Sequence, residues 1–147
     1  MKSLDKSSKS YRKATKVAMD LNGYYVKLQD AYVAEQGVYV GSWTKIGYIG
    51  PGTKNSDGTT TTTTFTYSDP GLSAGTTAIA NLSATAGWQA TNSAKLNDCN
   101  ASSTWQVKVA AGSTEANGSM VAYSEDVTGG ATGDCAALTP NFYNIGK

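Results

Sequence analysis

The sequence contains no histidine among its 147 residues. This absence removes the usual general base at neutral pH, every Ser–His or Cys–His nucleophile and the commonest transition-metal ligand. Charged residues make up only 16% of the chain, and no run approaches the roughly 20 apolar residues that span a bilayer. A signal-peptide pattern is also lacking. We therefore expect the given chain to be soluble and to act without cofactor or metal.

The few charged residues are unevenly distributed along the chain. Six of the 12 basic residues lie within residues 1–16, where Asp5 is the single acid, so this segment carries +5 and the remainder −4 of the net +1. Such an arm can bind nucleic acid or a membrane surface, but a solvated, frayed terminus is commoner. We expect no nucleic-acid partner.

Only two cysteines are present, Cys99 and Cys135, and both lie among Gly, Ser, Thr and Asn residues. This setting favours a single disulfide made outside the cytosol over a metal site, with two reduced thiols as the alternative. A bridge would close a long loop and contribute about 4 kcal/mol in the chain-entropy model.

The longest sustained period is that of residues 14–36, where apolar or small residues recur at a 4-3-4-3-4 spacing. This spacing predicts a helix of about 34 Å with one apolar face. Gly23 weakens it, and Gly37 is suited to its end. The predicted core stripe consists of Ala14, Ala18, Leu21, Tyr25, Leu28 and Tyr32.

Later segments alternate apolar and polar residues, which predicts strands with one buried face. The alternating positions are Trp88, Ala90, Ala94 and Leu96 in one strand and Trp105, Val107 and Val109 in the next, with a return strand at residues 120–123. A run of six threonines at residues 59–64 predicts a further strand or edge hairpin.

These patterns predict one α+β domain over residues 1–147, in which a long N-terminal helix packs on an antiparallel sheet of three to four strands. Residues 1–37 form the helix with its basic start, residues 38–86 connect helix to sheet, and residues 87–147 form the sheet with the disulfide-bounded C-terminal region.

Several residues suggest chemistry, each with a plainer interpretation. Asp98 and Asp134 each precede a cysteine and could form a two-carboxylate pair, but turn residues are commoner, so we expect no enzyme. Asn55, Asp57 and Gly58 resemble the start of a calcium loop that lacks its later acidic ligands. Three Asn-x-Ser sequons begin at Asn81, Asn100 and Asn117.

Aromatic residues offer one further kind of site. Trp43 and Tyr48 are the candidate exposed, ligand-facing aromatics, and they could contact a surface glycan. The alternative is that most tryptophans and tyrosines fill the core, since Trp88 and Trp105 occupy apolar positions of alternating strands.

Four segments together carry a family resemblance: LQDAYVAEQGVY at residues 28–39, SWTKIGYIGPG at residues 42–52, FTYS at residues 65–68 and the late cysteine pair. In this order they resemble the soluble part of a type IV pilin or a related pseudopilin without its N-terminal membrane segment. The resemblance covers the chain from about Ala14 and lies in spacing and residue type.

The resemblance implies a structural subunit of an extracellular pilus or periplasmic pseudopilus, whose partners are other pilin subunits. In that family an apolar segment upstream, methylated at its N-terminus, anchors the subunit in the inner membrane before assembly. The cysteine pair would staple the C-terminal variable region. A small-residue helix face such as Ala14 and Ala18 permits close helix packing, and head-to-tail packing that does not close generates filaments. The alternatives are an adhesin-like minor pilin and a carbohydrate-binding module.

Overall fold

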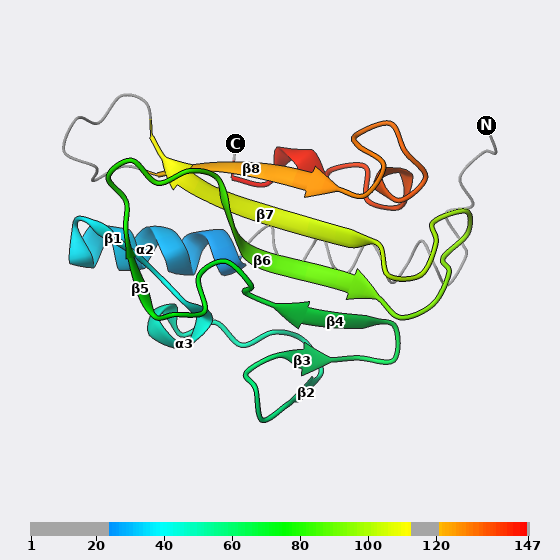
Figure 1. Ribbon diagram of the computed structural model, residues 1–147, viewed down its shortest axis with the longest axis horizontal. Helices are drawn as coiled ribbons and strands as arrows, with labels where there is room; N and C mark the ends of the chain where they lie inside the picture. Colours follow the sequence, from blue (N-terminus) through cyan, green and yellow to red (C-terminus); the bar gives the residue numbers. More distant parts are fainter. Residues whose placement is uncertain (1–23, 113–120, 147) are drawn as a thin grey trace.

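The computed structural model describes residues 24–112 and 121–146 of the protein, and these residues are mostly β (Figure 1). A six-stranded antiparallel sheet has the order β2-β3-β4-β6-β7-β8, and a separate pair joins β1 to β5. The strands of the large sheet are β2 (Thr53–Lys54), β3 (Thr60–Thr61), β4 (Phe65–Ser68), β6 (Thr85–Asn92), β7 (Thr104–Ala111) and β8 (Val121–Val127). The pair consists of β1 (Tyr39–Gly41) and β5 (Thr76–Ala78), and the helices are α2 (Val26–Gln36), α3 (Trp43–Ile46), and the 3-10 helices η2 (Ala136–Leu138) and η3 (Phe142–Asn144).

The predicted fold class, a long helix on three to four strands, is wrong. The longest helix among the described residues, α2, has 11 residues, and the large sheet has six strands. The error arose in residues 38–86, which we expected to connect helix and sheet. They contain β1, α3 and β2–β5, so this segment extends the sheet by three strands and adds the second pair.

The threonine run forms a tight reversal between two short strands. Only Thr60–Thr61 is extended, as β3, and the chain then turns into β4. The Thr62 hydroxyl accepts hydrogen bonds from the backbone N–H groups of Thr64 at 3.3 Å and Phe65 at 3.0 Å. A threonine side chain that bonds to nearby backbone in this manner favours a turn over a strand, so six β-formers in sequence yield a hairpin.

Strands β6 and β7 have the predicted alternation, with one face of each buried. Trp88, Ala90, Trp105, Val107 and Val109 are all fully buried. Ala94 and Leu96 lie beyond the end of β6, and Ala94 is exposed. The return strand β8 pairs with β7 from Ala111↔Val121 to Trp105↔Val127.

Every tryptophan in the core has a partner for its indole N–H. Trp43 donates to the Gly87 carbonyl oxygen, Trp88 to the Tyr48 hydroxyl, and Trp105 to the Thr139 hydroxyl, each at 3.0 Å. Buried indole groups without such partners would carry a desolvation cost. These three bonds therefore tie α3, the loop after it and the C-terminal segment to β6 and β7.

The buried side of α2 differs from the predicted stripe. Ala14, Ala18 and Leu21 lie outside the described residues, Tyr25 is fully buried, and Leu28 and Tyr32 are half-buried. The deepest positions are Tyr25, Gln29 and Val33, one turn apart, and Gln29 is 0% exposed. The centre of the buried face is therefore a polar residue that no hydrophobic pattern could reveal.

The side chain of Gln29 hydrogen-bonds to the edge of β1 in the way that a neighbouring strand would. Its Nε2 donates to the Gly41 carbonyl oxygen at 2.9 Å, and its Oε1 accepts from the Gly41 N–H at 2.8 Å. The same Nε2 also donates to the Tyr25 hydroxyl at 3.1 Å. A side-chain amide presents an N–H donor and a carbonyl acceptor side by side, as a peptide group does, so Gln29 closes the edge of β1 that faces away from β5.

Cys99 and Cys135 form a disulfide with a sequence separation of 36, as the cysteine count predicted. The bridge joins the turn after β6 to the start of η2. From there the chain places Leu138, Phe142 and Ile145, each at most 1% exposed, in the common core. Figure 1 shows this C-terminal segment beside β8.

Candidate functional site

A groove lies between α3 and the β2–β3 turn, and we call it the α3 groove. Its volume is about 530 Å³ and it opens widely to solvent. Trp43, Tyr48 and Ile49 line one side, and Lys54, Asp57 and Thr60 line the other. The lining residues of both walls lie within residues 43–60.

Helix α3 is short but capped at both ends. The Ser42 hydroxyl accepts from the Lys45 N–H at 3.3 Å, and Asp69 Oδ2 accepts from the Trp43 N–H at 2.9 Å. Gly47 follows in the left-handed region, with φ of 78°. Partial burial raises the pKa of the Asp69 carboxyl, and the Trp43 hydrogen bond only partly offsets this rise. These contacts fix the first wall of the groove.

The second wall is a turn stiffened by its own side chains. The Asn55 N–H donates to the Thr59 carbonyl at 2.8 Å, and Asn55 Nδ2 donates to the Thr59 and Thr61 hydroxyls at 3.0 and 2.8 Å. Asp57 Oδ1 accepts from the Thr59 hydroxyl at 2.6 Å and from its N–H at 3.0 Å. These bonds from Thr59 hold the pKa of the Asp57 carboxyl below its usual value, so Asp57 is anionic at neutral pH.

Thr60 lies at the base of this wall with an unsatisfied hydroxyl. It is 1% exposed, and its Oγ1 has no hydrogen-bond partner among the described residues. The hydroxyl faces Gly50, where a Cβ atom would collide with it. A buried hydroxyl without a partner costs roughly 1–3 kcal/mol, which makes Thr60 an unusual feature of the groove.

The aromatic residues of the groove contact one another more than they contact solvent. Tyr48 packs against Trp43 with ring centroids 4.8 Å apart and against Tyr24 at 5.4 Å. Trp43 and Tyr48 are each 4% exposed, so the expectation that they are exposed is not met, although both line the groove. The exposed apolar side chains here are Ile49 at 67% and Tyr24 at 48%.

The sequence did not reveal that Ile49 and Tyr24 are exposed, because neither residue interrupts a pattern of apolar and polar positions. The Tyr24-Tyr25 pair leaves open which ring faces the core, and only the contacts of Tyr25 with the sheet decide it. The sequence around Ile49 is rich in glycine, and within it Tyr48 is buried while Ile49 is exposed.

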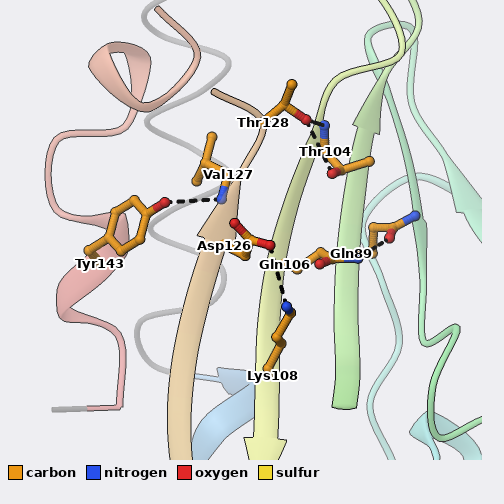
Figure 2. A network of polar contacts seen from close by, with 8 residues as sticks. All are labelled: Gln89, Thr104, Gln106, Lys108, Asp126, Val127, Thr128 and Tyr143. Carbon is orange, nitrogen blue, oxygen red and sulfur yellow. Dashed lines mark hydrogen bonds and ion pairs between the residues drawn. The ribbon is translucent and has the colours of Figure 1, made fainter. Parts of the chain in front are cut away.

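The outer face of the large sheet is polar, and its side chains are largely paired with one another (Figure 2). Gln106 Nε2 donates to Gln89 Oε1 at 2.7 Å, and Lys108 Nζ lies 3.3 Å from Asp126 Oδ2. An exposed ion pair of this kind contributes at most about 1 kcal/mol. A surface whose polar side chains pair with one another is typical of the solvated side of a sheet. The α3 groove is therefore the better candidate site.

The strand β8 is tied at its end by the C-terminal segment. The Val127 N–H donates to the Tyr143 hydroxyl at 3.0 Å, and Thr128 Oγ1 accepts from the Thr104 N–H at 2.8 Å (Figure 2). Both bonds lie at the same end of the sheet. They anchor the last strand without forming a pocket.

The remaining chemical candidates lie at the surface. Asp98 and Asp134 each precede a cysteine of the disulfide, and both are exposed. Asn81 and Asn100 are exposed, and Asn117 lies outside the described residues. Within the described ranges no three His, Cys, Asp or Glu side chains form a cluster that could hold a metal.

Comparisons of the chain with models of protein families, with curated proteins and with solved structures return no match. Across residues 24–112 and 121–146, no helix is both long and apolar enough to cross a bilayer. Any functional conclusion must therefore come from the surfaces and sites of the chain itself.

Proposed function

We propose that the chain is a non-catalytic structural subunit of an extracellular filament, related to type IV pilins or pseudopilins, that acts by self-assembly. The observation that carries this proposal is the outward side of α2. Tyr24, Lys27, Ala31 and Ala34 are all exposed and recur at a 3-4-3 spacing, so they form one continuous face. The disulfide supports an oxidising, extracytoplasmic location.

This face is suited to another helix. Ala31 and Ala34 have small side chains, which permit two helix backbones to approach closely. Lys27 and Glu35 carry opposite charges two turns apart, about 12 Å at 1.5 Å per residue. A copy displaced along the helix axis can pair its Glu35 with Lys27 and leave its own Lys27 for the next copy. Such a contact does not close on itself.

Because α2 has 11 residues, the predicted long N-terminal helix no longer supports this proposal. The proposal rests on α2 and on the basic segment before it. Residues 1–16 carry +5 against −4 for the rest of the chain. Opposite charges on the two parts of one subunit attract neighbouring copies at moderate salt. A strongly salt-sensitive assembly is therefore expected.

The test is electron microscopy of surface filaments in cells that express the full gene, with and without Ala31→Arg and Ala34→Arg. We expect the double variant to abolish filaments while the isolated chain keeps its thermal stability, because both positions are exposed. The matched control is Ala122→Arg, which alters an exposed alanine of β8. Filaments that persist in the double variant, or closed dimers in place of filaments, would refute the proposal.

A further inference from the structure

We propose that the α3 groove binds a neutral saccharide, held between the Asp57 turn and the apolar side of Ile49. The variants that test filament assembly change Ala31 and Ala34, which do not line the groove, so this proposal is tested separately from filament assembly. Either function can fail without the other.

The size and shape of the groove fit a small ligand. A volume of about 530 Å³ lies within the range of roughly 300–1,000 Å³ typical of small-molecule sites. The groove is open, so one end of a bound molecule would stay in solvent. This geometry suits a terminal sugar of a longer glycan better than a fully enclosed metabolite.

The apolar wall offers a surface for the C–H face of a sugar ring. Ile49 is 67% exposed, the highest value among the large hydrophobic residues that the structure describes. It extends the aromatic cluster of Trp43 and Tyr48, whose rings form the base of that wall. Covering Ile49 removes apolar surface from water, which favours binding.

The opposite wall offers groups for sugar hydroxyls. Asp57 uses Oδ1 for Thr59, and the second carboxylate oxygen, Oδ2, can accept from a sugar hydroxyl. Lys54 and Ser56 provide donors on the same turn. Because the Asn55 and Thr59 bonds already hold this turn in place, little ordering entropy is lost on binding.

The charges of the groove exclude other ligand classes. Lys54 is the single cation among the described residues that line the groove, and the Asp57 carboxylate nearby opposes a phosphate or sulfate. A divalent cation would need several further oxygen ligands, and the described residues form no such cluster. The ligand class that fits these groups is a neutral molecule that both donates and accepts hydrogen bonds.

Thr60 provides an independent observation. Its hydroxyl is buried at the base of the groove, faces Gly50 and has no partner among the described residues. A sugar hydroxyl that enters beside Gly50 is the partner that this hydroxyl lacks. Binding would thus satisfy a polar group that the free chain leaves unsatisfied.

The test is saturation-transfer NMR of the chain with galactose, mannose, N-acetylglucosamine and their disaccharides, followed by titration of the strongest binder. Asp57→Asn keeps an oxygen for Thr59, and Thr60→Val keeps the shape of the side chain. We expect at least tenfold weaker binding for Asp57→Asn and at least threefold for Thr60→Val. Thr60→Val should not lower the melting temperature, since it removes an unsatisfied hydroxyl, and this separates a role in binding from a role in folding.

The matched control is Asp126→Asn, which alters an exposed acid on the outer face of the sheet and should leave the affinity unchanged. Sulfated disaccharides and inorganic phosphate serve as anionic probes. The proposal is overturned if no neutral saccharide binds, if only the anionic probes bind, or if the affinity is the same in Asp57→Asn and Thr60→Val as in the parent chain.

Discussion

At the scale of single residues, Gln29 has the largest influence on how α2 meets the rest of the protein. Its side chain is fully buried and makes three hydrogen bonds, two of them to the backbone of Gly41. Buried polar groups stabilise a fold only while all of their partners are present. The position is therefore sensitive to any change of chemistry, even at constant volume.

We expect Gln29→Leu to lower the free energy of unfolding by about 2–4 kcal/mol, because it leaves the N–H and C=O of Gly41 buried without partners. Urea denaturation followed by tryptophan fluorescence measures the change. The matched control is Gln36→Leu, the same substitution at an exposed position of the same helix, which should stay within about 0.5 kcal/mol of the parent. Equal stability of Gln29→Leu and the parent would contradict the role of Gln29.

At the scale of elements, α2 is joined to the far strand of the sheet by one short hydrogen bond. The Tyr123 hydroxyl on β8 donates to Asp30 Oδ1 at 2.6 Å. Burial raises the pKa of Tyr123, and the hydrogen bond to the Asp30 carboxylate raises it further. Burial likewise raises the pKa of Tyr25 on the inner side of α2. The bond from Tyr123 to Asp30 thus requires a protonated phenol, and the burial of Tyr25 also favours its protonated form.

The fold should therefore lose stability in alkali. A tyrosine in the unfolded chain ionises near pH 10, whereas the folded state keeps these two protonated. Above about pH 10 the unfolded state then binds fewer protons, and the free energy of unfolding falls by about 1.4 kcal/mol per pH unit for each tyrosine. Below pH 10 this contribution is fully present and constant.

Urea denaturation between pH 8 and pH 12 measures this slope. In Tyr123→Phe one ionisable group is gone, so the decline should be about half as steep, although the variant is less stable at pH 8 because it lacks the bond to Asp30. An alkaline slope as steep in Tyr123→Phe as in the parent would show that other groups cause it.

At the scale of the whole molecule, the C-terminal segment closes the core and depends on the disulfide for its position. Cys135 precedes η2, and the residues after it bring Leu138, Phe142 and Ile145 into the core. Thr139 accepts the indole N–H of Trp105 at 3.0 Å. Two 3-10 helices of three residues each have little stability of their own, so the bridge and these contacts hold the segment in place.

Replacement of both cysteines by serine should lower the free energy of unfolding by about 4 kcal/mol, since the bridge closes a loop with a sequence separation of 36. Urea denaturation with and without dithiothreitol gives this value for the parent chain. The double variant is its own control, because reductant should not change it. A transition midpoint of the parent that does not move on reduction would contradict the stabilising role of the bridge.

Part of this architecture could be predicted because its signals are local. The alternation of Trp105, Val107 and Val109 determines which face of β7 is buried, since successive side chains on a strand point to opposite faces. The disulfide could be predicted because the sequence has only two cysteines and both lie among Gly, Ser, Thr and Asn residues. A loop at Asn55, Asp57 and Gly58 was also indicated, although its place in a groove was not, because that place depends on how α3 packs.

The rest depended on contacts between distant segments, which no period reveals. The sequence by itself determined that a helix precedes a β-rich region containing one disulfide. Only the tertiary structure decided that Gln29 is a core residue, that Tyr25 and not Tyr24 faces inward, and that residues 38–86 add strands. The physical reason is that burial of a polar or aromatic side chain is favourable only where a partner backbone or ring meets it, and Gly41, Gly87 and Tyr48 become such partners once the chain has folded.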